Sequence, residues 1–515
     1  MAATHTTTSR MARRAAIVFA AASAALALAT ALRLPAAWES GNALNHVSGV
    51  WLTLADDLAR GTLYRPLHAP GSGYGGTRYF PLVFALQAGL VRMGAPLLAA
   101  GYAASLAAGL LLAFAVFLLL RAAGIPARRA AVFAPLALAG FAGQHALSAA
   151  RGDLLPVALS ALSLAAIARG PGRARVPLAA VALTLAFGAK PTALTAAAAA
   201  VAALVLRRAR RGALALAGLV SALALAAVAV TDALSAGRFL AGLRELATAG
   251  ATAGTVVRAP LRLAEQLALG DPAGLVLALG AAVALAASLH PLLRAVRAGA
   301  DDPRLVPALW LAAAWGGALV VFATPGTGVN HLLEVEAASA ALLGATASAP
   351  GRARTLARAW APAAALAGLA VALALWRADA SSSRLAELRG VVRALPPGAP
   401  VLSEDPLVPL LAGERPYLLD PFTIRLTAAR APEVWAPLAD AIRHGAFPSV
   451  VLFEDLASPA SDRWYAEGNL GLPLAAEIRR GYRRAGGFGR YHLYLPRAAA
   501  GAGAGAGVVR RDEAG

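Results

Sequence analysis

Long apolar stretches recur along the whole chain and limit what it can fold into. The first covers residues 14–36, about the length of a helix that crosses ~30 Å of hydrocarbon. Of the 515 residues 59% are hydrophobic and 14% are charged, and the mean hydropathy is +0.63, which no water-soluble protein of this length would have. Later stretches lie at about 98–120, 130–147, 154–168, 176–189, 192–206, 212–231, 272–292, 305–323, 329–348 and 359–376. The sequence therefore predicts an α-helical polytopic membrane protein with about eleven transmembrane helices.

The positions of the arginines predict the topology. The net charge is +20, and the basic residues gather in short clusters between apolar stretches, which is typical of cytoplasmic loops rather than of a nucleic-acid surface. If the N-terminus is cytoplasmic and the first span is not cleaved, every cluster falls on the cytoplasmic side. This holds only if residues 80–96 form a helix in or on the outer leaflet instead of a span. The chain has no cysteine, which excludes disulfides and thiolate metal sites.

This topology divides the chain into three parts. Residues 1–376 form the transmembrane domain, whose long outer loops are 37–97 and 233–270. Residues 377–497 are more polar and predict a small α/β domain outside the membrane, and 498–515 predict a disordered low-complexity tail. Four short β-like runs mark the α/β domain, at 400–405, 416–421, 449–454 and 491–496.

Several acids are predicted at the outer face. Arg151 and Asp153 flank Gly152 in a short outer turn, where the simplest interpretation is an ion pair whose aspartate caps the next helix. Glu39 follows the first span directly. Asp57 and its neighbour Asp56 lie on an amphipathic helix whose apolar side carries Trp51, Leu54 and Leu58, and the favoured interpretation of the two aspartates is a solvated charged face.

Two further features suggest a polar cavity. Lys190 is the only lysine in the chain, and its compact cation suits a phosphate oxygen, although snorkelling to the membrane surface would also explain it. Asn330, His331 and Glu334 fall on one face of the tenth span, and Glu336 points elsewhere. Such groups are costly in a membrane unless they line an aqueous pocket. The spacing of His331 and Glu334 is only weak evidence for a metal site.

The pattern resembles the GT-C superfamily of membrane glycosyltransferases, which includes protein O-mannosyltransferases, lipid A aminoarabinose transferases and oligosaccharyltransferases. The resemblance covers most of the chain. It rests on an acid just after the first span (Glu39), on GTLYRP (61–66) followed by RYFP (78–81), on an acid after the third span (Asp153), and on the LSEDP and LLDPF segments at 402–406 and 418–422. The first-loop acid is usually Asp in this superfamily, so either Glu39 or Asp57 could hold its role.

The resemblance implies a bacterial inner-membrane enzyme that moves a hexose or pentose from a polyprenyl-phosphate donor to a glycan, lipid or protein acceptor. A carboxylate would deprotonate the acceptor hydroxyl, and cations would stabilise the phosphate leaving group. The implied catalytic residues are Glu39, Asp153 and Asp57. The implied phosphate-binding residues are Lys190, Arg78 and Arg151, and Tyr79, Asn330, His331 and Glu334 would line the pocket. No cofactor is required, although the sequence leaves a divalent metal ion at Asp153 open.

Three other classes remain open on the sequence alone. A transporter or lipid-linked sugar flippase would need polar residues near the membrane midplane and an internal repeat, neither of which is evident. A polysaccharide polymerase or ligase also uses polyprenyl-linked sugars but would favour a large late loop. A non-catalytic membrane scaffold is the third.

Overall fold

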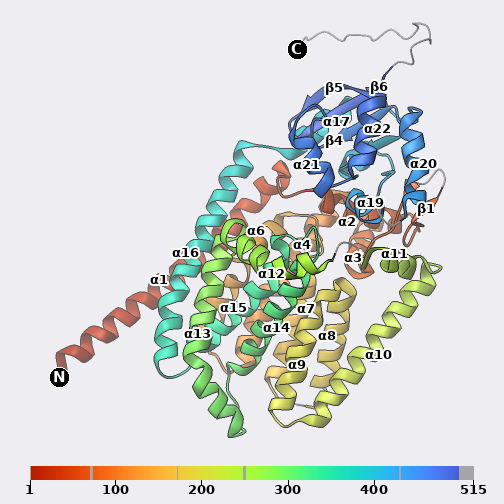
Figure 1. Ribbon diagram of the computed structural model, residues 1–515. Helices are drawn as coiled ribbons and strands as arrows, with labels where there is room; N and C mark the ends of the chain where they lie inside the picture. Colours follow the sequence, from red (N-terminus) through yellow and green to blue (C-terminus); the bar gives the residue numbers. More distant parts are fainter. Residues whose placement is uncertain (1, 70–72, 171, 248–250, 429–430, 498–515) are drawn as a thin grey trace.

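The computed structural model describes residues 2–69, 73–170, 172–247, 251–428 and 431–497 (Figure 1). The tail predicted to be disordered lies outside the described residues. The chain forms a bundle of long helices, and a smaller C-terminal domain with a β-sheet sits on one end of it. We call this end of the bundle the domain end.

The apolar stretches of the sequence form the helices of the bundle, as expected. Six of the described helices are long and apolar enough to cross a membrane, or seven if one bent pair counts as a single span. The others are shorter, so the total of eleven spans remains a prediction. The main helices are α1 (Ala2–Ser40), α4 (Leu97–Ala122), α7 (Leu154–Ala168), α8 (Arg175–Ala189), α9 (Leu194–Leu206), α10 (Arg210–Leu234), α13 (Pro272–Arg297), α14 (Leu305–Phe322), α15 (Leu333–Thr346) and α16 (Arg352–Ser381).

The stretch predicted as one span at 130–147 is broken. It forms α5 (Ala127–Phe133), the 3-10 helix η1 (Ala134–Leu138) and α6 (Phe141–Ser148), and the two halves are bent by 78°. Asp271 caps the second half, since its carboxylate accepts hydrogen bonds from the backbone N–H groups of Phe141 at 2.8 Å and Ala142 at 3.1 Å. The carboxyl group of Glu336 lies against Gly140, so a larger residue at this position would have to displace that carboxyl group.

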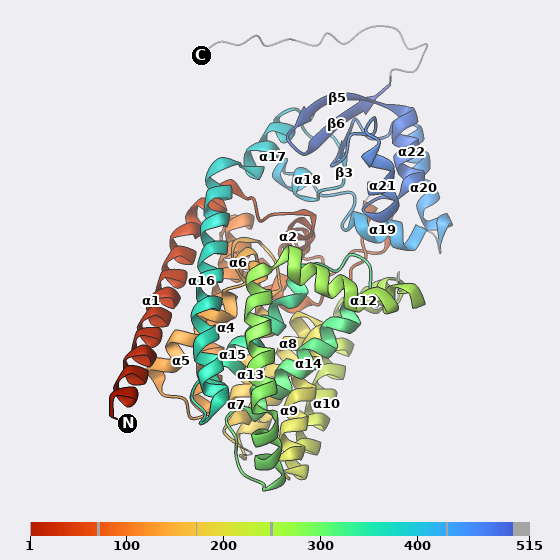
Figure 2. The ribbon, with the colours of Figure 1, turned by 60° about the vertical axis from the view of Figure 1, so that its left-hand side comes forward.

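The first and last helices of the bundle, α1 and α16, run side by side (Figure 2). Arg33 of α1 is 1% exposed, and its guanidinium pairs with Asp379 of α16 at 3.2 Å. It also donates to the backbone carbonyl of Gln144 at 2.7 Å. The buried charge of Arg33 is thus neutralised and hydrogen-bonded, as a charge inside a membrane protein must be.

The two predicted outer loops carry short helices. The first contains α2 (His46–Ala59), β1 (His68–Ala69), β2 (Gly73–Tyr74) and α3 (Pro81–Arg92). The stretch expected to be a non-spanning helix at 80–96 is thus the short helix α3. The second loop contains α11 (Arg238–Ala247), α12 (Ala253–Glu265) and η3 (Gln266–Gly270).

The solvated face predicted for Asp56 and Asp57 is wrong for Asp57. Its side chain is 3% exposed. Its carboxylate receives hydrogen bonds from Arg65, at 2.5 and 2.9 Å, and from Arg415 of the C-terminal domain at 3.0 Å. Helical periodicity could not predict this burial, because both partners lie outside α2.

The C-terminal domain is built on a four-stranded sheet with the order β3-β4-β6-β5. Strands β3 (Val401–Ser403) and β4 (Ser449–Leu452) are parallel, whereas β6 (Tyr491–Pro496) is antiparallel to β4 and β5 (Tyr482–Phe488). The helices around it are α17 (Arg384–Arg393), α18 (Leu407–Leu411), α19 (Pro421–Ala428), α20 (Pro432–Arg443), α21 (Ala460–Glu467) and α22 (Leu472–Gly481).

The predictions of strands at 400–405, 449–454 and 491–496 are confirmed, but that at 416–421 is wrong. There the chain makes only an isolated bridge between Leu418 and Tyr74, which ties the domain to the first loop. Strand β5 was not predicted, because its sequence YRRAGGF is polar and glycine-containing and does not alternate between apolar and polar residues.

Candidate active site

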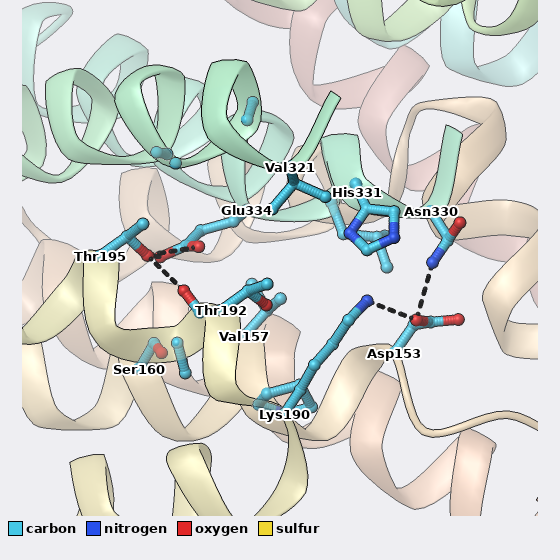
Figure 3. Close-up of a pocket in the computed structure, with 16 residues that line it drawn as sticks. Asp153, Val157, Ser160, Lys190, Thr192, Thr195, Val321, Asn330, His331 and Glu334 are labelled. Carbon is cyan, nitrogen blue, oxygen red and sulfur yellow. Dashed lines mark hydrogen bonds and ion pairs between the residues drawn. The ribbon is translucent and has the colours of Figure 1, made fainter. Parts of the chain in front are cut away.

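A pocket opens between α7, α9, α14 and α15 at the domain end of the bundle (Figure 3). Its polar groups sit at two depths. Asp153, Lys190, Asn330 and His331 gather at one end, and Glu334 lies farther along α15 beside Thr195. Small and apolar residues line much of the wall between them, including Val157, Ala193, Ala314, Gly317, Ala318 and Val321. The pocket therefore has a charged end, which we call the mouth, and an interior whose wall is mostly apolar but also carries Glu334 and Thr195.

Lys190 lies where the chain breaks between two helices. It ends α8 in an extended conformation, with φ −160° and ψ 125°, before the 3-10 turn η2 (Pro191–Ala193). Pro191 causes this break, because a residue before proline is driven out of the α region. The ammonium group of Lys190 lies 2.9 Å from Oδ1 of Asp153 and the side chain is 18% exposed, so N–H groups remain free for a ligand.

Asp153 occupies the N-terminus of α7 and is nearly surrounded by donors. Besides Lys190, Asn330 donates to Oδ1 at 3.0 Å, and Nε of Arg151 lies 2.9 Å from Oδ2. The ion pair predicted for the Arg-Gly-Asp turn is therefore present. The predicted cap is wrong, because the Asp153 side chain accepts no hydrogen bond from the backbone of α7. Its donors are instead Arg151 of the same turn and two residues from other segments, Lys190 and Asn330.

The start of α15 supplies the opposite wall. Asn330 and His331 lie on the 3-10 helix η4 (Val329–Leu332), and Glu334 follows on α15. Glu334 accepts hydrogen bonds from the Thr195 hydroxyl at 2.6 Å and from Nε1 of Trp310 at 2.9 Å. Glu336 instead faces the break at Gly140. The helical spacing therefore separates these two acids as expected.

The loop before α3 brings two more predicted residues near this mouth. Burial and the charges of Asp420 and Asp153 raise the pKa of the Tyr79 hydroxyl, whereas Arg78 and Arg151 oppose the increase. Arg78 is half-buried and makes no hydrogen bond or ion pair with any residue in the described ranges. Burial raises the pKa of Asp420, against the charge of Arg78. Tyr79 and Arg78 thus lie among the charges of the turn and of the C-terminal domain.

Asp420 was missed as a site residue. It was noticed only as part of the LLDPF segment, whose expected strand suggested no side-chain role. In the structure it precedes α19 and its carboxylate accepts a hydrogen bond from the backbone N–H of Phe422 at 3.2 Å. The Asp-Pro pair before a helical pattern was the available signal, because aspartate and proline are common where a helix begins.

Two predicted catalytic acids lie elsewhere. Glu39 is exposed on the last turn of α1, and it makes no hydrogen bond or ion pair with the residues that the structure describes. Asp57 is held by Arg65 and Arg415 and does not line the pocket of Asp153. Of the three acids proposed as catalytic, the structure brings only Asp153 into this pocket.

The pocket does not fit a divalent metal ion. Across the described parts of the chain, no three His, Cys, Asp or Glu side chains are placed to hold one. Asp153, the residue proposed for this role, already accepts hydrogen bonds at Oδ1 from Lys190 and Asn330 and is ion-paired at Oδ2 with Arg151. Both carboxylate oxygens of Glu334 likewise lie within hydrogen-bond distance of the Thr195 hydroxyl.

No family model matches the sequence, and no curated protein matches it either. The fold does have solved neighbours. ArnT from Cupriavidus metallidurans, solved bound to undecaprenyl phosphate, is 14% identical with a TM-score of 0.57, and the match covers 92% of this chain and 98% of ArnT. The oligosaccharyltransferase of Archaeoglobus fulgidus in its apo form is 13% identical with a TM-score of 0.54, covering 92% of this chain and 74% of that one.

Both neighbours are membrane glycosyltransferases with one architecture. The chain shares the fold of these two proteins. This confirms the predicted fold class, a helical membrane bundle followed by a small C-terminal domain with a sheet. In this shared fold the pocket of Asp153 and Lys190 lies at the domain end of the bundle. At this level of identity the neighbours establish the fold and leave the residue roles to the geometry of the chain itself.

Proposed function

We propose that the protein is a membrane glycosyltransferase that takes a sugar from a polyprenyl-phosphate donor and passes it to an acceptor on the extracytoplasmic face. The observation that carries the proposal is the pocket itself, in which Lys190 stands at a charged mouth beside an interior whose wall is mostly apolar. A polyprenyl phosphate combines the same two chemistries, an anionic head and an apolar chain. ArnT was solved bound to such a lipid.

The charges at the mouth favour an anion. At the end of the pocket that holds Asp153, the two cations Lys190 and Arg151 share this one carboxylate, so the group of three carries a net positive charge when all are ionised. A phosphate would balance that excess. Lys190 would contact it as a point charge, and the guanidinium of Arg78 is free of polar partners within the described ranges.

The proposed reaction is a displacement at the anomeric carbon of the donor sugar. An acceptor oxygen loses its proton and attacks that carbon, while the bond to the phosphate oxygen breaks and the electron pair leaves with the polyprenyl phosphate. Lys190 and Arg78 would stabilise the charge that develops on the leaving group. Asp153 would hold Lys190 and Arg151 in position. The fold neighbours favour this function over a transporter or flippase.

The topology that we propose follows from the arginine distribution. The N-terminus would be cytoplasmic, and the C-terminal domain and the pocket would face away from the cytoplasm, as expected for an enzyme of the bacterial inner membrane. A lipid carrier would suit this side, since nucleotide sugars remain in the cytoplasm. We propose further that the sugar is a hexose or a pentose. The acceptor would be a glycan, a lipid or a protein.

Reconstituting the full chain in phospholipid vesicles would test the proposal. Undecaprenyl-phosphate mannose, glucose and aminoarabinose, each radiolabelled in the sugar, would be supplied with cell-envelope extract as acceptor. We expect one donor to release undecaprenyl phosphate and label the extract, and Lys190→Ala to lose this activity. Arg463→Ala is the control, because that arginine is 83% exposed in the C-terminal domain. Donor that crosses the vesicle membrane without losing its sugar would indicate a transporter and contradict the proposal.

A further inference from the structure

A groove of about 470 Å³ lies between α8 and α10, at the end of the bundle away from the pocket of Asp153. Asp153 lies at the N-terminus of α7, whereas the groove begins at Gly172 and Arg173, after the C-terminus of α7. Helix α10 runs from there toward the domain end (Figure 1). The length of α7, about 22 Å at 1.5 Å per residue, therefore separates the groove from the candidate active site.

The walls of the groove are apolar. Val176 and Pro177 line it from α8, and Ala215 and Leu219 line it from α10. Ala215 and Leu219 are four residues apart, so they lie above one another on the same face of α10. An apolar groove on the outside of a membrane bundle faces the acyl chains of the bilayer.

Two arginines line the groove at its outer end. Arg173 precedes α8, and Arg211 is the second residue of α10. Both are exposed, and neither makes a hydrogen bond or an ion pair with a residue in the described ranges. Arg207, which precedes α10, is by contrast ion-paired with Asp301 at 3.1 Å. The guanidinium groups of Arg173 and Arg211 are therefore available to a ligand.

No acid of the groove balances these two charges. Between Asp153 and Asp232 the sequence contains neither Asp nor Glu, and the residues that line the groove include no carboxylate. Two guanidinium groups at one groove repel each other, and an anion held between them would remove that repulsion. The groove thus combines a place for an anion with an apolar wall.

A phospholipid with a negative charge has both of these properties. Leu219 lies eight residues beyond Arg211 along α10, which places it about 12 Å deeper in the bundle. A headgroup at the arginines would therefore leave an acyl chain alongside Leu219. A soluble anion such as free phosphate would leave the apolar wall uncovered. Basic groups at the membrane ends of helices are known to attract anionic lipids.

We propose that this groove binds an anionic phospholipid of the surrounding membrane. Its phosphodiester lies between Arg173 and Arg211, and one acyl chain follows Ala215 and Leu219. Of the 25 residues of α10 only three are buried, so a bound lipid would add to the few contacts that hold this helix against α8. The site lies outside the candidate active site and does not depend on the proposed function.

The binding of radiolabelled phosphatidylglycerol to the full chain in detergent would test the proposal. We expect the wild type to bind this lipid at least tenfold more tightly than the zwitterionic phosphatidylcholine. Each arginine near an anionic headgroup contributes about a fivefold factor, so the double variant Arg173→Gln/Arg211→Gln should raise Kd by about 25-fold. Ala215→Trp should also weaken binding, by about tenfold, because it fills the groove without changing its charge.

Arg294→Gln/Arg297→Gln is the matched control. It removes the same charge from exposed positions at the end of α13, outside the groove, and should keep Kd within about twofold of the wild type. An equal loss in this control would show that only the overall charge matters and would overturn the proposal. Wild-type affinity in the Arg173→Gln/Arg211→Gln variant would also overturn it.

A competition experiment identifies the lipid. Undecaprenyl phosphate also has an anionic head and an apolar chain, so it is added to the phosphatidylglycerol complex at increasing concentration. We expect it to displace phosphatidylglycerol no better than unlabelled phosphatidylglycerol does. Displacement at a tenfold lower concentration would make the groove a polyprenyl-phosphate site and contradict the proposal. The assay measures no turnover, so its result is independent of whether the chain transfers a sugar.

Discussion

Replacing Asp57 by Asn distinguishes a structural acid from a catalytic one. Asp57 is 3% exposed in its side chain and Arg65 is 2% exposed, and the two groups share a pair of hydrogen bonds. The amide of Asn has nearly the same shape but no charge. The substitution therefore leaves the buried guanidinium of Arg65 without its counter-charge.

The size of the effect follows from that burial. Removing one partner of a buried ion pair costs about 3–5 kcal/mol. Arg65 retains a hydrogen bond to the carbonyl of Pro416 at 2.6 Å, so we expect the lower end of the range, about 3 kcal/mol. For a unit of 150–250 residues each kcal/mol lowers Tm by about 2–4 °C, so Tm should fall by roughly 6–12 °C.

Tryptophan fluorescence during heating of the detergent-solubilised chain would measure the change, because Trp435 and Trp464 lie in the C-terminal domain that Arg415 ties to Asp57. Asp56→Asn is the control. Its partner Arg60 is 70% exposed, so this pair should contribute less than about 1 kcal/mol. The reasoning is refuted if Asp57→Asn melts with the wild type, or if it keeps its Tm and loses turnover.

Three further predictions concern single side chains. Lys190→Ala should weaken the binding of undecaprenyl phosphate by about tenfold or more, and Lys190→Arg should recover part of it; equal binding by all three proteins in a flotation assay would exclude a phosphate contact. Glu39→Gln should keep turnover within about threefold in the vesicle assay, because the side chain is exposed away from the pocket, and a loss of about 100-fold would restore it as the base. Burial raises the pKa of Glu404 to about 7 from 4.5, so the native state binds more protons than the unfolded state between these values, and Tm should fall as the pH rises through this window. Glu404→Gln should flatten that dependence, whereas Glu467→Gln, at a position 71% exposed, should leave it unchanged, and an unaltered slope in the first variant would contradict the assignment.

The fold was largely predictable because its main determinant is local. Long apolar stretches and arginine clusters are visible residue by residue, and they gave the helices and the separate C-terminal domain. The break at Gly140 was not visible, because Asp271 and Glu336, which hold and fill it, are more than a hundred residues away. Strand β5 was not predicted, because its sequence is polar and glycine-containing and does not alternate between apolar and polar residues.

The site was predictable only in part. Lys190, Asp153, Asn330, His331 and Glu334 do meet in one pocket, because each lies at a helix end where a polar residue interrupts an apolar pattern. The prediction that Asp57 could be a catalytic acid failed because its partner Arg415 lies far along the chain, in the C-terminal domain.

The pairing of Arg33 with Asp379 has a consequence for synthesis. The two residues are separated by 346 positions, so Arg33 enters the membrane long before its counter-charge has been translated. Until α16 is inserted, the first helix must keep that guanidinium hydrated, which favours a provisional depth or tilt over its final one. The first helix therefore reaches its final position only when α16 has been inserted. A nascent chain arrested before residue 379 should remain susceptible to membrane quality-control proteases.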